Sequence, residues 1–469
     1  MLQDTIAAIS TALGEAAISV VRVSGPQALT IAAKAIKLPT QLPPRVAHLV
    51  HAVDADGNSF DHGLLLHFKG PASYTGEDVI EFHGHGGVLV TQRVLERLLA
   101  CGARAAEPGE FTQRAFLNGK MDLTQAEAVM DLIHAQSTLA LRAANEQLGG
   151  AIGREATAMQ QEIIPVLAHI EAFIDFPEED ISPETGADLM RRIDAVLERA
   201  QKLIATSEQG RILRHGARTV ISGAPNVGKS SLLNLLLGFE RAIVSPTAGT
   251  TRDTIEEIIQ VHGIPLRLVD TAGLRESTDD IERVGIQRTE RELDRADLVI
   301  EVVDASQPAT TVQRLALPDS IAKRRILVLN KADLGIHVDW STVTGAFLPP
   351  ASQQRAMNGP STSGINTIPL SCVTGDGIEA LRDAIREIIA HAGPLAADHP
   401  VAINARHKAA FERSAESLRA AKAALERGEA PEFIALEIRE ALHSLGDVIG
   451  QVDVERILDV IFSTFCIGK

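Results

Sequence analysis

The clearest indication of the fold is in residues 217–238, which read ARTVISGAPNVGKSSLLNLLLG. Within it, residues 223–230 fit the pattern G-x-x-x-x-G-K-[ST], between a strand-like run at 219–222 and an apolar run typical of a helix. Glycines at these places let backbone N–H groups close round phosphates at a helix N-terminus. Lys229 would reach the β/γ oxygens, and Ser230 would offer a hydroxyl to Mg²⁺. The stretch therefore predicts a nucleoside triphosphate site in an α/β domain.

A later motif predicts that the nucleotide is GTP. Asn330-Lys331-Ala332-Asp333 follows the apolar run at 326–329. An aspartate at Asp333 can accept from both N1–H and the exocyclic amine of guanine, a pair that adenine does not present, and such a site rejects the analogue by up to ~10⁴-fold. The run Ser371, Cys372 and Val373 would lie behind the base, which gives Cys372 a structural role.

Two further motifs stand where switch loops are expected. Asp270-Thr271-Ala272-Gly273 follows the strand-like run 266–269, which places a carboxylate near the metal's water shell and a glycine N–H near the γ-phosphate. Thr250 and Thr251 lie upstream, where a loop could bring a hydroxyl to the metal. Leu274 stands where many GTPases carry the glutamine that orients water, so another group must do so here.

The carboxylates that could orient water crowd one charged segment at 275–297. Taken from the residues alone, that segment reads equally as a solvated, charged helix. The competing side chains are Asp279, Asp280, Glu282, Glu290 and Glu292.

The flanking sequence predicts a multidomain α/β protein. Residues 1–119 alternate strand-like runs with glycine turns and predict an N-terminal α+β domain. Residues 120–215 are helical in pattern, with a capping box at Thr124–Glu127 and a break at 175–186. Residues 216–385 form the P-loop (Ras-like) GTPase domain, inserted into a helical domain that residues 386–469 complete, because neither helical segment alone can cover its apolar stripe. The polar 348–367 segment reads as a surface loop.

Composition limits the class of protein. Of 469 residues, 45% are hydrophobic and 23% charged, a balance typical of soluble globular proteins. The three cysteines are too few and too scattered for a disulfide framework or a CxxC metal site. No signal peptide or membrane span is evident, so we expect a cytoplasmic protein. The net charge of −16 opposes extended contact with nucleic acid phosphates.

The whole chain resembles the tRNA-modification GTPase MnmE (TrmE) family. The resemblance lies in the start DTIAAIS, in SYTGEDVIEFHGHGG (73–87), in PGEFTQRAFLNGKMDLTQAEAV (108–129), in IDFPEED (174–180) and in the tail FCIGK. It implies a cytoplasmic homodimer that works with the flavoprotein MnmG. The substrate would be the wobble uridine of certain tRNAs, modified at carbon 5 with a folate-carried one-carbon unit.

The resemblance also implies residue roles. Potassium would be held by Asn226, Ser245, Thr247 and Thr250, and would supply the charge that an arginine finger gives elsewhere. Mg²⁺ would be held by Ser230 and Thr251, and Glu282 would orient water as the catalytic residue. The full set expected to contact GTP is Asn226, Val227, Gly228, Lys229, Ser230, Ser231, Ser245, Thr247, Thr250, Thr251, Asp270, Thr271, Ala272, Gly273, Asn330, Lys331, Asp333, Ser371, Cys372 and Val373.

In the N-terminal domain the resemblance implies a site for 5-formyltetrahydrofolate. Arg22, Glu81 and Lys120 match its positions, and Lys469 would join from the tail. A carboxylate suits the donor edge of a pterin, and cations suit the carboxylates of folate. Surface ion pairing is the alternative from the residues alone. His83-Gly84-His85 suggests a metal, but no third ligand stands at a recognisable spacing.

Cys466 in the tail has three interpretations. A prenyl anchor does not fit, because Gly468 and Lys469 occupy positions that such a motif fills otherwise. Burial is favoured by pattern, since Cys466 extends a row with Leu458 and Phe462. The resemblance instead implies a catalytic thiol at the folate site.

A rival function remains open at this point. A GTPase switch could recruit an RNA or ribosomal partner without one-carbon chemistry, but it predicts a basic RNA-binding appendage, and the flanking domains carry no such run.

Overall fold

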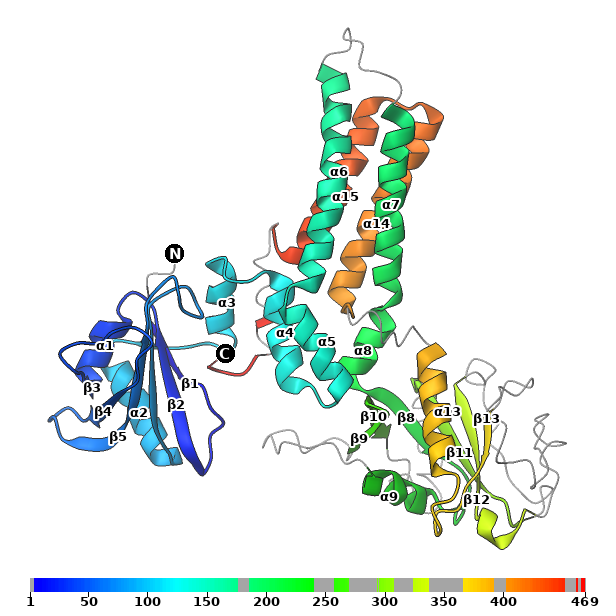
Figure 1. The fold of residues 1–469 in the computed structure, drawn as a ribbon, viewed down its shortest axis with the longest axis horizontal. Coiled ribbons are helices and arrows are strands. Elements are labelled where there is room, and N and C mark those ends of the chain that lie inside the picture. The colour runs from blue at the N-terminus through cyan, green and yellow to red at the C-terminus, as the bar shows by residue number, and fades with distance from the viewer. Residues whose placement is uncertain are drawn as a thin grey trace, which may run out of the picture. The chain divides into compact units, whose positions relative to one another are not determined.

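The computed structural model describes residues 4–175, 185–239, 257–269, 293, 295–307, 324–336, 366–391, 402–451, 461–462 and 465–468. The chain divides into two compact units, each described by itself below. The first comprises residues 1–130, 147–196 and 416–469, and the second comprises 131–146 and 197–415. Figure 1 labels the elements along the chain. The predicted fold class is confirmed: an N-terminal α+β domain, helices from two chain segments, and a P-loop α/β domain that lies between those segments in the sequence.

The N-terminal domain is a seven-stranded sheet with helices on one face. Its strand order is β3-β4-β5-β6-β2-β1-β7. The apolar side chains of alternate strand residues, such as Val21, Val23 and Phe82, pack with α1 and α2, while Arg22 between them points to the other face. The elements are β1 (Ile6–Ile9), β2 (Ala16–Ser24), α1 (Ala28–Ala35), β3 (Ile36–Lys37), β4 (His48–Val53), β5 (Ser59–Phe68), β6 (Val79–Gly86), α2 (Val88–Ala100) and β7 (Arg104–Ala105).

Helix α3 (Glu110–Leu117) follows the sheet and receives the end of the chain. Gly109, just before it, has a φ of 68°, and a Cβ atom there would lie 2.9 Å from side-chain atoms of Phe462 and Phe465. The position therefore needs glycine both for its backbone and for its space. The absence of a side chain at Gly109 therefore allows Phe462 and Phe465 to approach the start of α3.

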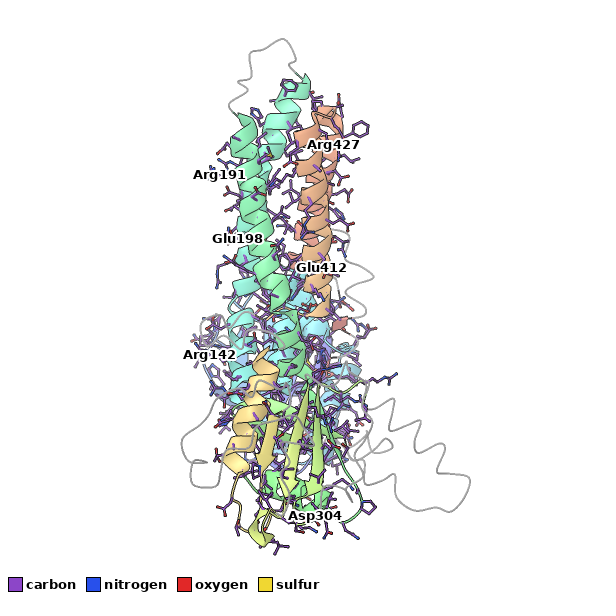
Figure 2. The ribbon with its side chains drawn as sticks, turned by 90° about the vertical axis from the view of Figure 1, so that its right-hand side faces the viewer. Arg142, Arg191, Glu198, Asp304, Glu412 and Arg427 are labelled. Carbon is purple, nitrogen blue, oxygen red and sulfur yellow. The ribbon has the colours of Figure 1, made fainter. Side chains whose placement is uncertain are left out.

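The helices of the first unit pack through regular apolar stripes. In α6 (Ala151–Asp175) the buried positions recur three or four residues apart, and α15 (Pro431–Ile449) buries a matching stripe against it. Figure 1 shows α6 and α15, which are far apart in sequence, running side by side. Figure 2 shows the helix that carries Arg191 and Glu198 beside the helix that carries Glu412 and Arg427. Lys422 of α14 (Ala405–Arg427) pairs with Asp194 of α7 (Thr185–Ala205) at 2.6 Å. The expected pairing of the two helical segments is thus found.

The predicted capping box at Thr124–Glu127 is wrong. Helix α4 (Leu123–His134) already includes Thr124, and the residue that caps it is Asp122, two positions before the predicted cap. The Asp122 carboxylate accepts from the Gln125 N–H at 2.9 Å, and the Gln125 side chain accepts from the Asp122 N–H at 3.0 Å. Asp122 also binds the Thr124 hydroxyl at 2.6 Å, which draws that hydroxyl away from a capping role. Helix α5 (Thr138–Leu148) follows.

The second unit holds a six-stranded sheet of order β13-β12-β11-β8-β10-β9, parallel except for β9. Its strands β8, β11 and β12 are almost wholly buried, as expected of a parallel sheet covered on both faces. Their carboxyl ends meet at one edge, where ligands of such sheets bind. The elements are α8 (Ser207–His215), β8 (Ala217–Ser222), α9 (Lys229–Phe239), β9 (Glu257–Val261), β10 (Ile264–Val269), β11 (Leu298–Asp304), β12 (Arg325–Asn330), η3 (Ala332–Leu334), β13 (Asn366–Pro369) and α13 (Ile378–His391).

In the part of the chain that the structure describes, none of the helices combines the length and the apolar character needed to cross a membrane.

Candidate functional site

The loop between β8 and α9 has the backbone of a phosphate-binding loop. Gly223, Asn226 and Gly228 all have positive φ angles, of 147°, 63° and 101°. Lys229 folds back over the loop, and its Nζ donates to the carbonyls of Gly223 at 2.7 Å and Ala224 at 2.8 Å. Ser230 and Ser231 lie exposed in the first turn of α9, where N–H groups and the helix dipole favour an anion. The arrangement suits the phosphates of a nucleotide.

Asn330 ties this loop to the rest of the site. Its Nδ2 donates to the Val227 carbonyl at 2.7 Å, and its Oδ1 accepts from the Cys372 N–H at 3.2 Å. The side chain is only 2% exposed. A Cβ atom on Gly228 would lie 2.1 Å from the Asn330 Nδ2, so this glycine is what allows the close approach. One buried amide therefore joins the phosphate loop, the end of β12 and residues 371–373.

Lys331 is fixed by its backbone and by an ion pair. It has a φ of 63°, and its Nζ lies 2.6 Å from Oδ2 of Asp304 at the end of the neighbouring strand β11. Burial raises the pKa of the Asp304 carboxyl, but hydrogen bonds from Lys331 and Ser306 outweigh it and hold the pKa below its usual value. Asp304 is thus ionised at neutral pH and holds the Lys331 ammonium at the sheet edge. Asp333 lies exposed on η3.

Residues 371–373 form a tight turn beside Asn330. The Ser371 hydroxyl accepts from the N–H groups of Val373 and Thr374, both at 3.2 Å, and the Ser371 N–H binds the Asp376 carbonyl. Cys372 packs against the core of the sheet, and burial raises the pKa of its thiol. Cys372 is thus part of the packing of this domain, and the position of residues 371–373 behind the base stays a prediction.

The remaining predicted residues of the GTP site and of the tail lie outside the described residues. They are Ser245, Thr247, Thr250, Thr251, Asp270, Thr271, Ala272, Gly273, Glu282 and Lys469. Of the predicted metal ligands only Asn226 and Ser230 are described, and both are exposed at the phosphate loop.

A second cluster surrounds Arg22 in the N-terminal domain. Arg22 Nε donates to Glu81 Oε1 at 2.8 Å across the neighbouring strands β2 and β6, and the two side chains are 17% and 15% exposed. The guanidinium carbon lies over the Tyr74 ring at 5.6 Å from its centroid and over the Phe111 ring at 5.5 Å. His83 Nε2 lies 3.2 Å from the other oxygen of Glu81. Two aromatic rings and a carboxylate therefore fix one half-buried cation.

Of the other predicted folate residues, Lys120 lies beside helix α3, where its N–H donates to the Ala115 carbonyl. Phe111, which contacts Arg22, lies in α3, and Lys120 follows it. Lys120 Nζ donates to the Pro71 carbonyl at 2.8 Å, in the loop that carries Tyr74. At the start of α3 the Gly109 N–H reaches the Cys466 carbonyl at 3.4 Å, and Ile467 forms a β-bridge with Pro108. Arg22, Lys120 and residues 466–467 thus each contact α3 or the residues just before it, and Glu81 is joined to them through Arg22.

The burial interpretation of Cys466 is wrong. Cys466 is exposed and lies beyond the last described helical residues, 461–462. The row with Phe462 fails because the backbone has left the helix before position 466, as the bridge to Pro108 shows. The thiol is therefore accessible on the N-terminal domain.

The two histidines of the HGH run have other partners. His83 contacts Glu81, and His85 Nδ1 bonds the buried Asp61 carboxylate at 2.6 Å. Among the described residues no group of three or more histidine, cysteine or acidic side chains is arranged to hold a metal.

Sequence reasoning missed Tyr74, Phe111 and Asp304. Asp304 carried a usable signal, because it follows the apolar run 298–303 as Asn330 follows its own strand, and parallel strands end at one edge. Tyr74 and Phe111 carried none, since nothing local to positions 22, 74 and 111 predicts that they meet.

Comparison with known proteins gives full-length matches. The family model described as MnmE helical domain matches residues 123–466, and the one described as GTP-binding protein TrmE N-terminus matches residues 5–120. The tRNA modification GTPase MnmE of Akkermansia muciniphila is 52% identical over 470 residues, covering 100% of this chain and 99% of its own. That of Aquifex aeolicus is 41% identical, covering 100% of both chains.

Among solved structures, the G domain of the T. maritima FeoB iron transporter aligns with 37% of this chain and 98% of its own length, at 28% identity. Its TM-score is 0.25, so the assignment rests on the sequence matches, which run through the N-terminal domain, the phosphate loop and the tail alike. The chain belongs to the MnmE family of tRNA-modification GTPases.

Proposed function

We propose that this chain hydrolyses GTP to drive modification of tRNA wobble uridines at carbon 5, with a flavoprotein partner, MnmG, and a one-carbon unit carried by 5-formyltetrahydrofolate. One observation carries the proposal: a chain with full-length MnmE relatives has both a phosphate loop at the carboxyl ends of its parallel strands and the Arg22 cluster. We call the first of these the nucleotide edge. Each supplies one half of the chemistry.

At the nucleotide edge, this chain's residues bind and orient the substrate. Backbone N–H groups at the start of α9 receive the phosphates, and the Lys229 ammonium can exchange its loop carbonyls for phosphate oxygens. Asp333 accepts hydrogen bonds from N1–H and the exocyclic amine of guanine. Asn330 joins the phosphate loop to residues 371–373. Glu282 would orient the attacking water.

The described residues offer part of the set of oxygen donors that the proposed metal sites need. Ser230 offers an exposed hydroxyl and Asn226 an exposed amide oxygen at the phosphate loop, and both are donors of the kind that Mg²⁺ and K⁺ prefer. Thr251 would complete the Mg²⁺ set, and Ser245, Thr247 and Thr250 the K⁺ set. When bound, these cations supply positive charge to the phosphoryl group in the transition state.

At the Arg22 cluster the residues suit a ligand with both an aromatic ring and carboxylates. The bond to Glu81 uses only Nε of Arg22, so the terminal nitrogens can donate to a ligand carboxylate. The Tyr74 and Phe111 rings offer apolar faces beside it. Folate has both features, and the exposed Cys466 thiol and Lys120 lie at the same helix, α3.

We further propose a cytoplasmic homodimer in which K⁺ promotes hydrolysis. The experiment that tests these assignments measures GTP hydrolysis in matched KCl and NaCl, and 5-formyltetrahydrofolate binding by calorimetry. We expect faster hydrolysis in K⁺, and folate binding that Arg22→Ala or Glu81→Ala removes while hydrolysis persists. Equal rates in both salts would refute the K⁺ sites, and folate binding that survives both substitutions would refute the folate site.

A further inference from the structure

Tyr74 lies in a loop without regular secondary structure, residues 70–78, yet its position is closely defined. Its ring lies against the Arg22 guanidinium, and its hydroxyl lies 2.8 Å from the Thr112 hydroxyl of α3. Burial raises the pKa of the Tyr74 phenol above its ordinary value. A loop residue held in this way needs an anchor outside its own backbone.

That anchor is a set of side chains on α3 and on β2. Asn118, which follows α3, donates Nδ2 to the Thr75 carbonyl at 2.7 Å. The Ser24 hydroxyl contacts Thr75 Oγ1 and donates to Glu77 Oε2, both at 2.7 Å. Each of these bonds reaches the loop within three residues of Tyr74.

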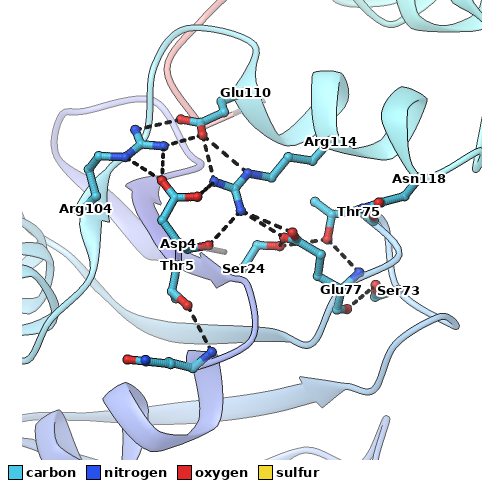
Figure 3. Close-up of polar contacts among 11 residues, drawn as sticks. Asp4, Thr5, Ser24, Ser73, Thr75, Glu77, Arg104, Glu110, Arg114 and Asn118 are labelled. Atoms are coloured by element: carbon cyan, nitrogen blue, oxygen red, sulfur yellow. Dashed lines mark hydrogen bonds and ion pairs between the residues drawn. The ribbon is translucent and has the colours of Figure 1, made fainter. Parts of the chain in front are cut away.

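A buried arginine, Arg114, adds a further link to the 70–78 loop through its ion pair with Glu77. Arg114 of α3 has no exposed side-chain surface and binds Glu77, Glu110 and Asp4, at 3.2, 2.8 and 2.8 Å. Figure 3 shows its guanidinium pointing between these three carboxylates, with Arg104 bridging Asp4 and Glu110 on the far side. Because a buried charge is costly unless it is paired, Arg114 and Glu77 hold each other in place.

We propose that Tyr74 positions the ligand of the Arg22 cluster, and that Asn118 and the Arg114–Glu77 pair are positioning residues that act through the 70–78 loop. The loop is held in one conformation that places the Tyr74 ring against Arg22. The guanidinium therefore presents its terminal nitrogens in one orientation. The inference rests on the proposed folate function, whose ligand combines a flat heterocycle with carboxylates. Asn118 then contributes to folate affinity without touching folate.

The sequence offers a specific probe, because Tyr74 is the only tyrosine of the chain. An ultraviolet titration of phenolate absorbance therefore reports on this side chain alone. In the unchanged protein we expect a pKa above the ordinary value of about 10. Circular dichroism at each pH defines the range in which the fold persists.

The test uses Asn118→Ala and Asn118→Asp. The first removes the bond to the Thr75 carbonyl, and the second keeps the size but turns an acceptor toward it. Asn58→Ala is the matched control, since Asn58 also donates its amide, at 3.2 Å, but in the turn between β4 and β5. Each variant is compared for phenol pKa, 5-formyltetrahydrofolate affinity and GTP hydrolysis.

We expect both Asn118 variants to lower the Tyr74 pKa toward the ordinary value and to weaken folate binding by about fivefold to tenfold, the loss typical of one hydrogen bond. GTP hydrolysis and the Asn58→Ala control should not change. An unchanged pKa, or a lowered pKa with undiminished folate binding, would overturn the inference alone. An unchanged protein that binds no folate would overturn the proposed folate function, and the role of Tyr74 with it.

Discussion

Asn330→Ala should weaken GTP binding far more than the loss of one side-chain contact would suggest. The substitution removes both hydrogen bonds that join the phosphate loop, β12 and residues 371–373. Each such bond contributes about 1 kcal/mol net, and a buried partner left unpaired costs about 1–3 kcal/mol. Because Asn330 is buried, water does not readily replace the amide for the Val227 carbonyl or the Cys372 N–H.

From these two terms we expect a loss of about 2–3 kcal/mol in nucleotide binding, which is a rise of about 30- to 150-fold in Kd. The assay is titration with a fluorescent GDP analogue, together with thermal unfolding to confirm that the variant folds. Asn330→Asp provides a sharper version, since it turns a charged acceptor toward the Val227 carbonyl and should weaken binding at least as much. Either variant binding within threefold of the unchanged protein would refute the role of Asn330 as a tie.

Three further predictions concern other residues. Glu282→Ala should lower kcat by ~10²-fold with little change in nucleotide affinity, because a water-orienting group acts in the transition state. An unchanged kcat in stopped-flow hydrolysis would favour the alternative that Glu282 is a solvated charge on a helix. Cys466→Ser should leave folding and GTP hydrolysis intact while wobble-uridine modification falls sharply, and normal modification at normal expression would contradict a catalytic thiol. Burial raises the pKa of Glu110, but bonds from Arg104, the Glu107 N–H and Arg114 outweigh it and leave that pKa lowered. A lowered carboxyl pKa stabilises the fold above the unfolded value of about 4.3 and this stability is lost as pH falls below it. Between neutral pH and about pH 3.5, the free energy of unfolding measured in urea should therefore fall more in the unchanged protein than in Glu110→Gln. Equal falls in the two proteins would contradict the pairing of Glu110 with the arginines.

The sequence was sufficient for the elements whose chemistry is local. The phosphate loop needs glycines and a lysine at fixed spacing, and the buried strand before Asn330 needs only an apolar run, so both were found where predicted. The stripes of α6 and α15 carry the same kind of signal.

The failures have two physical causes, which are competition between groups and contacts that only the tertiary fold makes. Thr124 has the right spacing for a cap, but Asp122 is a stronger acceptor and takes the position. Cys466 continues a helical row in sequence, but its backbone is not helical and the next residue, Ile467, pairs with Pro108. The Arg22 cluster unites β2, the 70–78 loop and α3, and only the tertiary fold decides that they meet.

Mass spectrometry of wobble uridines, in tRNA from a strain that lacks this chain, measures directly whether the modification depends on it. The strain is complemented with the unchanged chain or with Lys229→Ala, which removes the ammonium that lies over the phosphate loop. We predict that the carbon 5 modification disappears on deletion, returns with the unchanged chain and stays absent with Lys229→Ala. Full modification in the deletion strain would contradict the proposed function, and full modification with Lys229→Ala would contradict its dependence on GTP.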